Sequence, residues 1–251
     1  MLGCDCRVCT SADPRDRRLR VSAHVEGATE GGPVHIQIDT GPDFRQQALR
    51  YGIRRVDAVL FTHHHFDHVV GMDDLRPLVR HDEPAIPCYA SAETAGVLRR
   101  SFSYIFVDHS YPGVARLDLH EVDGPFDVRS RAGAAGPVRV VPVPARHGDI
   151  DVLGYRIGRF AHLTDVSAVP ESSLPLLDGL DVLVLDGLRA RPHPTHLSFD
   201  DAVAVARRVG ARRTFLVHMT HDALHAEAEN DLPPDVRLGV DGMVVVVGMG
   251  E

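Results

Sequence analysis

The sequence predicts an α/β fold, and three observations support this prediction. Short apolar runs typical of buried strands recur along the chain, most clearly at 56–61 and 180–186. Several are followed by helix-start signals, such as Ser91 and Ser198 in N-cap positions. The strand-then-helix pattern occurs roughly twice, once in each half of the chain. We therefore expect an α/β architecture with one domain over 1–251.

Length and composition set broad limits on function. The chain has 251 residues, 44% of them hydrophobic, and a formal net charge of -8. This length suits one large domain or two small ones and leaves enough residues for a buried core. The negative charge disfavours a nucleic-acid partner. No apolar stretch approaches membrane-spanning length and the first residues lack a signal-peptide pattern, so we expect a cytoplasmic protein without a membrane partner.

Three of the four cysteines crowd the start of the chain. Cys4, Cys6 and Cys9 form a C-x-C-x-x-C pattern, whose thiolates can bind tetrahedral zinc with one position left over. A disulfide or a redox pair is the alternative. Cys88 stands alone and is expected to be a small buried apolar residue.

The next elements are a strand and a helix. Residues 34–38 alternate in polarity like a strand, and Asp39 follows directly. Asp39 through Pro42 is expected to end this strand and open a helix through Arg50, with Pro42 in its first turn. Simple turn formation is the plain alternative role for Asp39.

The most informative stretch is Thr62 through His68, directly after the apolar run 56–61. It holds His63, His65, Asp67 and His68. On a continuing strand, Asp67 and His68 would point to opposite faces, whereas on a helix His63 and His65 would diverge. The four side chains converge only if the strand ends near Thr62 and a helix starts near Asp67. This spacing indicates a site for Zn²⁺ or a similar ion, with more than one metal; a solvated histidine-rich loop is the alternative.

The middle of the chain continues the same alternation. We expect a helix over 71–79, a strand over 85–90 and a helix from Ser91 to about Arg100. The segment 101–113 is unusually aromatic for a chain with 6% aromatic residues. It can be a lid or a substrate wall, or it can pack in the ordinary way.

The second half places further polar residues at strand ends. Four or five short strands are expected between 117 and 160, with His147 ending one strand and Asp165 following another. The buried strand 180–186 precedes the loop 187–196, a helix capped by Ser198 and a last strand ending at His218. A single histidine at a strand end is often structural, but ligands in α/β proteins gather at this edge.

The motif H-x-H-x-D-H at 63–68 resembles the signature of the metallo-β-lactamase superfamily. The resemblance implies a four-layer αββα sandwich with one or two metals at the strand ends. It implies that His63, His65 and His147 hold one ion, that Asp67, His68 and His218 hold the second, and that Asp165 bridges them. Asp39 resembles the carboxylate that orients metal ligands or bound water in this superfamily.

A narrower resemblance covers nearly the whole chain. The cysteine cluster with the following charged turn, the stretches 192–196 and 218–222, and the ending 232–243 are similar to the phosphodiesterase branch that includes the phosphoribosyl cyclic phosphodiesterase of carbon–phosphorus lyase operons. The resemblance implies that His221 completes the cysteine cluster. Cys4, Cys6, Cys9 and His221 would then form a closed structural zinc site.

This branch usually begins with a strand and a Gly/Thr-rich loop before the cysteines, whereas this chain starts at Met1-Leu2-Gly3. Either the start was assigned too late or an edge strand is missing. A missing strand would leave unpaired backbone groups on its neighbour near 19–25. We therefore expect an upstream extension to increase stability and metal content.

Together these features predict a dinuclear metal-dependent hydrolase of a small phosphodiester, linear or cyclic. Two ions, Zn²⁺ or Mn²⁺, would lower the pKa of a shared water and neutralise charge on the phosphoryl oxygens. Catalytic roles are expected for His196, as general acid, and for Asp67. His196, His193 and Arg189 are candidates for substrate binding, although solvated surface is the alternative for the last two.

Other functions are compatible with the same sequence features. The same metal core serves thioesterases, lactonases and tRNA 3′-processing nucleases, although the nuclease is disfavoured by net acidity. A non-catalytic metal carrier resembling the B protein of pyrroloquinoline quinone biosynthesis is a further alternative. Family members are often dimers, so a homodimer is a candidate assembly. The natural substrate and the identity of the catalytic metal do not follow from the sequence.

Overall fold

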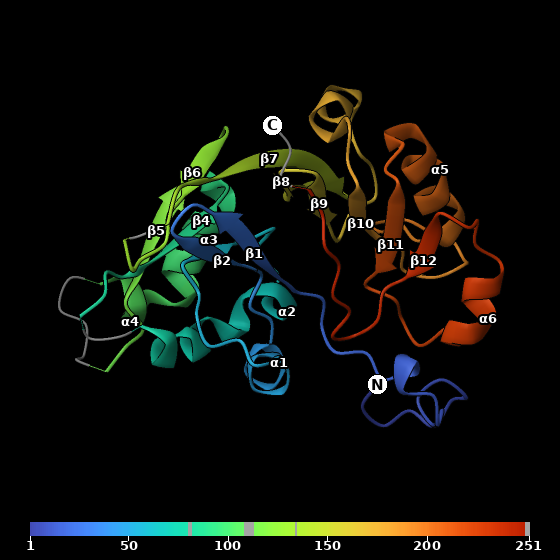
Figure 1. Ribbon diagram of the computed structural model, residues 1–251. Helices are drawn as coiled ribbons and strands as arrows, with labels where there is room; N and C mark the ends of the chain where they lie inside the picture. The colour runs from blue at the N-terminus through green and yellow to red at the C-terminus, as the bar shows by residue number, and fades with distance from the viewer. Residues whose placement is uncertain (80–81, 108–112, 134, 249–251) are drawn as a thin grey trace. The chain divides into compact units, whose positions relative to one another are not determined.

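The computed structural model describes residues 1–79, 82–107, 113–133 and 135–248. The chain forms two compact units (Figure 1). One unit comprises 20–142, and the other comprises 1–19 with 143–251. The predicted mixture of strands and helices is present in both. The single domain over 1–251 stays a prediction.

The 20–142 unit is built on a five-stranded sheet with the order β1-β2-β3-β4-β5. Its strands are β1 (Ala23–Thr29), β2 (Gly32–Ile38), β3 (Ala58–Leu60), β4 (Ile86–Ala90) and β5 (Leu117–Glu121). The β1–β2 pair is antiparallel, and β2 through β5 are parallel. The parallel strands therefore all end at one edge, where the residues after β2 and β3 meet. The strand expected at 56–61 is confirmed as β3, within a fully buried run.

Helices pack against this sheet and form an apolar core with it. They are α1 (Phe44–Tyr51), α2 (Phe66–Val69), the 3₁₀ helix η2 (Val70–Leu78), α3 (Ala92–Ser101) and α4 (Ser103–Phe106). The core includes Phe44, Phe61, Met72, Leu75 and Leu98, all buried. Ser91 caps α3 as predicted, because its Oγ accepts a hydrogen bond from the Thr94 backbone N–H at 3.3 Å.

One predicted detail of this unit was wrong, and one predicted helix is not an α-helix. Helix α1 begins at Phe44, so Pro42 lies in the preceding turn rather than in the first helical turn. Asp43 takes the N-cap position, and its carboxylate accepts from the Arg20 backbone N–H at 2.8 Å. The helix expected at 71–79 is a 3₁₀ helix that contains Pro77. Proline lacks the N–H that an α-helix would need at that position.

The aromatic segment 101–113 lies only partly within the described residues, because 108–112 fall outside them. In the described part, Phe102 and Ile105 are buried and join the core of the unit. Tyr104 is exposed. The described residues thus favour ordinary packing for this segment.

The other unit contains a second sheet, in the order β12-β11-β10-β9-β8. Its strands are β8 (Ile150–Ile157), β9 (Phe160–Leu163), β10 (Val182–Asp186), β11 (Arg213–Val217) and β12 (Val236–Leu238). Strands β9 through β12 are parallel, and β8 runs antiparallel to β9. Strand β7 (Val138–His147) belongs to both units, and its first residues pair with β6 (Phe126–Val128). The strands expected between 117 and 160 are confirmed.

Helix α5 (Phe199–Val209) packs on β10 and β11 through an apolar face that includes Ala202 and Ala206. Ser198 caps it as predicted, in a capping box with Asp201. The remaining helices of the unit are η1 (Pro14–Asp16), η3 (Glu171–Leu177) and α6 (His225–Asn230).

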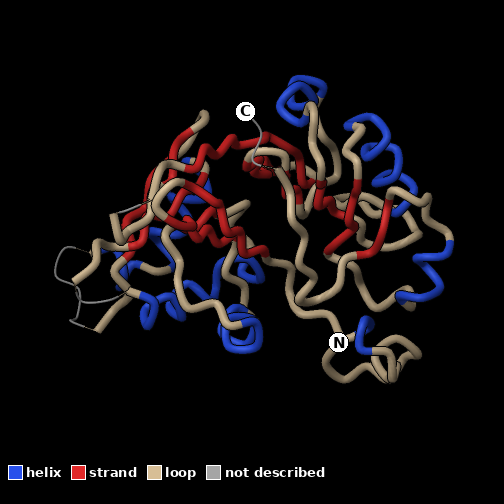
Figure 2. Tube along the Cα trace, viewed as in Figure 1, coloured by secondary structure: helices blue, strands red, loops and turns tan. Residues whose placement is uncertain are grey.

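The N-terminal segment 1–19 is a loop with one short helical turn, η1 (Figure 2). Asp16 is buried and accepts a hydrogen bond from the His225 backbone N–H at 2.8 Å. Arg18 donates to the carbonyl oxygens of Thr220 and Ala223, at 2.9 and 3.2 Å. These contacts tie the segment to the chain around 220–225, directly after β11.

Candidate functional site

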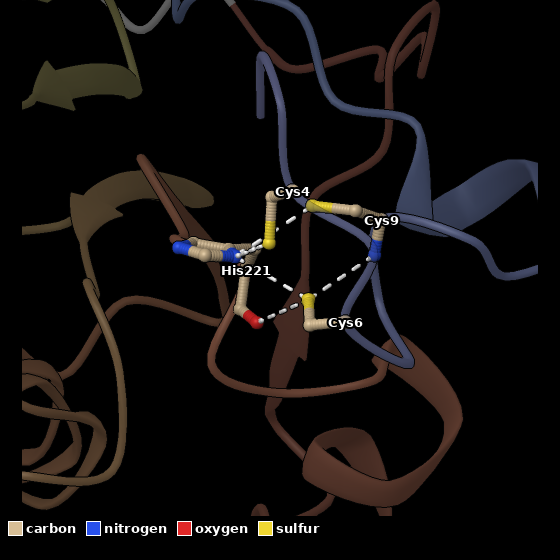
Figure 3. Close-up of side chains that lie close together, drawn as sticks. All are labelled: Cys4, Cys6, Cys9 and His221. Carbon is tan, nitrogen blue, oxygen red and sulfur yellow. Dashed lines mark hydrogen bonds between the residues drawn. The ribbon is translucent and has the colours of Figure 1, made fainter.

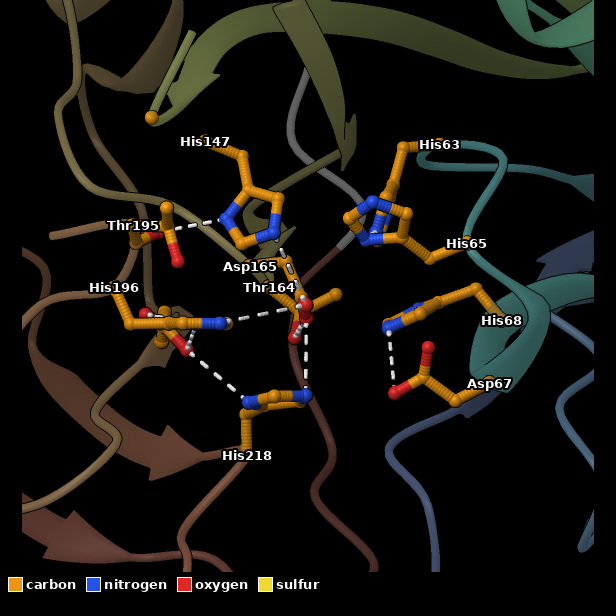
Figure 4. A network of polar contacts seen from close by, with 12 residues as sticks. His63, His65, Asp67, His68, His147, Thr164, Asp165, Thr195, His196 and His218 are labelled. Atoms are coloured by element: carbon orange, nitrogen blue, oxygen red, sulfur yellow. Dashed lines mark hydrogen bonds and ion pairs between the residues drawn. The ribbon is translucent and has the colours of Figure 1, made fainter. Parts of the chain in front are cut away.

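The predicted histidine cluster follows β3 directly. The strand ends at Leu60, and α2 begins at Phe66 with His65 as its N-cap residue. This is the strand-turn-helix path that the spacing predicted. Nε2 of His63 lies 2.9 Å from Nδ1 of His65, and the rings of His63 and His68 are 4.3 Å apart at their centroids. The three imidazoles point toward one another, and Asp67 lies beside His68 (Figure 4).

Asp39 organises this cluster from the end of β2. Its Oδ2 accepts hydrogen bonds from Nδ1 of His68 and from Oγ1 of Thr62, each at 2.8 Å, and its Oδ1 accepts from the Thr62 backbone N–H at 2.8 Å. Because the Thr62 hydroxyl donates to Asp39, its oxygen accepts from Nδ1 of His63 at 3.0 Å. Both histidines therefore carry their hydrogen on Nδ1 and present the lone pair of Nε2.

The backbone after β2 and the start of α2 are in close contact. The Thr40 N–H donates to the His68 carbonyl at 2.7 Å, and the Gly71 N–H donates to the Thr40 carbonyl at 2.8 Å. A Cβ on Gly41 would lie 2.1 Å from the Asp67 carbonyl oxygen, and one on Gly71 would lie 2.3 Å from the Gly41 carbonyl oxygen. Glycine is required at both positions for the loops to approach.

In the other unit, His147, Asp165 and His218 also meet at strand ends. His147 closes β7, Asp165 follows β9 and His218 follows β11. Nε2 of His218 is 3.4 Å from Oδ1 of Asp165, and Nε2 of His147 is 4.0 Å from Oδ2 (Figure 4). Nδ1 of His147 donates to the Thr195 carbonyl at 2.6 Å, so the lone pair of Nε2 faces the carboxylate.

The backbone is unusual at three of these residues. Among the described residues, the non-glycine positions with positive φ are Asp39 (59°), Asp165 (54°) and His218 (65°). Each lies within two residues of the carboxyl end of a parallel strand. Such conformations cost about 1–3 kcal/mol each and are concentrated at functional sites.

His196 joins the second cluster through a residue that sequence reasoning missed. Its Nδ1 lies 3.2 Å from Oδ2 of Asp186, and its ring stacks on that of His218 with centroids 4.8 Å apart. Its Nε2 lies 4.0 Å from Oδ2 of Asp165. Asp186 is the last residue of β10, and a carboxylate at a strand end is the signal that also indicated Asp165, but its role was not predicted.

Asp186 is fully buried. Burial raises its pKa to about 8; His218 opposes this rise, and the Asp165 carboxylate adds to it. Burial therefore favours the protonated form of Asp186.

The two further substrate-binding candidates lie on the loop after β10. The His193 ring is 5.1 Å from that of His196 between centroids. Arg189 lies 3.7 Å from Asp222 and donates to the carbonyl oxygens of Arg191 and Pro192. These contacts give Arg189 a role in holding its own loop. Phosphate binding by Arg189 and His193 stays a prediction.

The cysteine cluster is brought together with His221 (Figure 3). Nδ1 of His221 lies 3.4 Å from Sγ of Cys4 and of Cys6, and 3.6 Å from Sγ of Cys9. In a tetrahedral zinc site, ordinary bond lengths place sulfur and nitrogen about 3.6 Å apart. Backbone N–H donation from Cys9 and the His221 side chain lower the pKa of Cys6 to about 6. All four cysteines are free thiols, so the disulfide alternative is not supported.

The donor sets fit the metals predicted for them. Imidazole and carboxylate at the strand ends suit zinc or manganese, and three thiolates with one imidazole suit zinc. The fold and these residues together define an α/β protein with candidate sites for divalent metals.

Comparison with known proteins identifies the family. A model described as the beta-lactamase superfamily domain matches residues 35–219, and the chain belongs to this superfamily. The match confirms the predicted superfamily and α/β fold class. It also supports a hydrolase whose relatives depend on metals.

Two relatives are 40% identical to this chain over the aligned residues. One is a crystal structure described as a new diphosphatase from the PhnP family, with a TM-score of 0.86 over 99% of this chain and 92% of that one. This likeness agrees with the predicted phosphodiesterase branch. The other is an octanoyltransferase of Porphyromonas gingivalis (strain ATCC BAA-308 / W83), matched over 98% of this chain. The chain spans about half (48%) of that relative's length.

More distant structures share the fold. Zn²⁺-bound PqqB from Methylobacterium extorquens is 18% identical with a TM-score of 0.71, over 98% of this chain and 95% of that one. The short form of human tRNase Z is 18% identical with a TM-score of 0.66, over 92% and 96% of the two chains. Among the described residues, no helix has both the length and the apolar character needed to cross a membrane.

Proposed function

We propose that this protein is a dinuclear metal-dependent hydrolase that cleaves a P–O bond in a small phosphodiester, linear or cyclic. The observation that carries the proposal is the set of imidazoles and carboxylates at the strand ends, several of them with Nδ1 bonded so that Nε2 presents its lone pair. Membership of the superfamily and 40% identity to a PhnP-family diphosphatase support it.

The proposed ligand assignment follows the superfamily resemblance. One ion would be held by His63, His65 and His147, the second by Asp67, His68 and His218, and Asp165 would bind both. Within each unit, the short distances among these side chains support the assignment. Zn²⁺ or Mn²⁺ would activate a water and neutralise charge on the phosphoryl oxygens. Cys4, Cys6, Cys9 and His221 would hold a separate structural zinc.

The protein's own residues would position the substrate and move the proton. His196 is the proposed general acid, and Asp186 holds its Nδ1 so that Nε2 faces Asp165. A protonated Nε2 can then protonate a leaving alkoxide. Asp67 is proposed as a ligand with a catalytic role, and Arg20 lies 3.2 Å from its Oδ2. His193 and Arg189 are proposed to contact phosphate.

A second candidate is hydrolysis of a diphosphate, and the diphosphatase named for the 40% identical structure favours it. The two reactions differ in the leaving group. An alkoxide needs a proton as it departs, whereas a phosphate is stable as an anion near neutral pH. A general acid at His196 is therefore more useful for a phosphodiester than for a diphosphate.

Octanoyl transfer is not proposed for this chain, because the relative with that name is about twice as long. Transfer through a thiol would also need an accessible cysteine. Cys4, Cys6 and Cys9 are grouped with His221, and burial raises the pKa of Cys88.

Thioester, lactone or tRNA hydrolysis and a PqqB-like carrier role stay alternatives. A cytoplasmic location and a homodimer stay predictions.

The experiment is turnover by the full chain, loaded with Mn²⁺ or Zn²⁺, first with bis(p-nitrophenyl) phosphate. A panel of cyclic and linear nucleotides, sugar phosphates, dinucleotide diphosphates and octanoyl thioesters then defines the bond cleaved. We expect phosphodiester turnover that His65→Ala abolishes and His120→Ala leaves intact. His120 lies on β5 and pairs with Asp118. Two bound metals without turnover would favour a carrier, and thioester turnover alone would favour acyl chemistry.

A further inference from the structure

A third group of metal-binding side chains lies on the β1–β2 hairpin. His24 and Glu26 lie on β1, and His35 lies opposite Glu26 on β2. Because side chains alternate along a strand, His24, Glu26 and His35 share one face of the hairpin. One candidate ligand atom from each lies within 4.8 Å of the other two. The proposed function does not use this group.

A buried glutamine fixes the orientation of His24. The Gln37 side-chain N–H groups donate to Oγ of Ser22 at 2.6 Å and to the Asp39 carbonyl at 2.9 Å. The amide oxygen of Gln37 therefore faces Nδ1 of His24, at 3.2 Å, and accepts its hydrogen. It follows that His24 presents the lone pair of Nε2, the nitrogen that lies 3.3 Å from Nδ1 of His35.

We propose that His24 Nε2, His35 Nδ1 and Glu26 Oε1 form an accessory site for a divalent transition metal, with zinc the best match. Two nitrogens bound to tetrahedral zinc are about 3.3–3.4 Å apart. The observed separation is 3.3 Å. Oε1 of Glu26 is 3.9 Å from Nδ1 of His35, and this exposed side chain can close the difference by rotation. Solvent would fill the fourth position.

The donor set selects the class of metal. Two imidazoles with one carboxylate favour zinc, copper or nickel over Mg²⁺ and Ca²⁺, which prefer oxygen ligands. Burial lowers the pKa of His24, so this imidazole is neutral and able to bind a cation at physiological pH. In the metal-free protein, Nδ1–H of His35 can donate to Nε2 of His24. Binding then requires His35 to move its hydrogen to Nε2.

The location suggests a structural effect. In the described part of the chain, β1 is the end strand of its sheet and pairs with β2. A metal bound by both strands would link the end strand to its neighbour. Metal binding that occurs only in the folded state stabilises that state. We therefore expect zinc to stabilise the β1–β2 hairpin.

The test compares the zinc content of the full, tag-free chain with that of His35→Ala. Each protein is equilibrated with excess zinc, desalted and measured by elemental analysis. We expect His35→Ala to hold one zinc fewer per chain and to lose part of the zinc-dependent rise in Tm. His120→Ala is the matched control, since this histidine lies in the same sheet beside one carboxylate, and it should match the wild type. Equal zinc content in His35→Ala and the wild type would overturn the proposal.

Glu26→Gln provides a second variant that should leave folding intact, because Glu26 is exposed. We expect at least tenfold weaker zinc binding at this site in a competition titration with a chromophoric chelator. Unchanged affinity would remove Glu26 from the ligand set and overturn the three-ligand site. The comparison is between variants of one chain, so it does not depend on how many ions the proposed catalytic site holds. When Cys6→Ser is combined with either of these variants, it should lower the zinc content independently of the change at the accessory site.

Discussion

Nδ1 of His68 donates to Oδ2 of Asp39 at 2.8 Å, and both side chains are buried. This contact links the residue after β2 to the helix after β3 and fixes which nitrogen of His68 can bind a metal. The same carboxylate accepts from Thr62, whose hydroxyl accepts from His63. One buried carboxylate thus orients two predicted ligands.

Asp39→Asn should weaken metal binding in the histidine cluster by about 10–100-fold. Asparagine tolerates the positive φ, so the backbone can be kept. If the side-chain oxygen of the new asparagine accepts from the Thr62 N–H, however, its side-chain NH₂ group faces Nδ1–H of His68 and cannot accept that hydrogen. His68 would have to change tautomer or lose its partner. Metal affinity measured by chelator competition tests this, with Asp43→Asn as the control on the same loop. An unchanged affinity would contradict the orienting role of Asp39.

Gly71→Ala should lower both stability and metal affinity. Its Cβ would lie 2.3 Å from the Gly41 carbonyl oxygen, so the loop after β2 and the start of η2 must separate. We expect a loss of about 1–3 kcal/mol, as for overpacking elsewhere. Gly96→Ala on α3 is the matched control, because its Cβ would meet only the end of Arg100 at 3.5 Å. Chemical denaturation of both variants measures the difference; similar stabilities would refute the close-approach argument.

Cys6→Ser should remove one zinc per chain and lower Tm by about 2–4 °C for each kcal/mol of lost stability. A structural zinc contributes directly to folding, and here it would connect the segment 1–19 to His221 after β11. Elemental analysis and thermal unfolding measure the two effects. Cys88→Ala is the control, because Cys88 is buried in the other unit. This variant should lower stability without changing the zinc content. Equal loss of zinc in both variants would argue against the site.

Some of these features could be predicted from the sequence, and the reasons are physical. His63, His65, Asp67 and His68 lie within six positions after an apolar run, so local spacing alone indicates convergence. His147, Asp165 and His218 follow strands that are recognisable by their apolar residues. The role of Asp186 depends on its contact with His196, ten residues further along a loop, and such a contact needs the folded structure. The His24–His35 pair depends on the β1–β2 register, which composition does not specify.

Asp57 should make the stability of the 20–142 unit depend on pH. Burial alone would raise the pKa of Asp57, but donation from Arg55 and from the backbone N–H groups of His35 and Arg131 outweighs it and lowers the pKa below 3.8. A lowered pKa in the folded state means that the ionised group stabilises the fold above its unfolded pKa, about 3.9. This contribution is lost as the pH falls through the lower folded value.

Asp57→Asn tests this dependence. Removing the buried charge beside Arg55 should cost about 3 kcal/mol near pH 7. The difference from the wild type should be constant above about pH 5 and shrink below about pH 4. Denaturation curves of both proteins from about pH 3 to about pH 7 measure this difference. A difference that grows as the pH falls would have the wrong sign for a stabilising carboxylate.

His196→Ala should discriminate between substrates by their leaving groups. If His196 protonates the leaving oxygen, its loss should slow hydrolysis of alkyl phosphodiesters by about 10²–10⁴-fold. Nitrophenyl esters and diphosphates should be affected much less, because their leaving groups depart as stable anions. Arg189→Ala serves as the control on the same loop, since loss of a phosphate contact should raise KM for all substrates alike. The ratio of kcat/KM values for alkyl and nitrophenyl diesters gives the readout, together with its dependence on pH. Equal losses for both esters would assign His196 to binding or metal positioning, and the general-acid role would have to be abandoned.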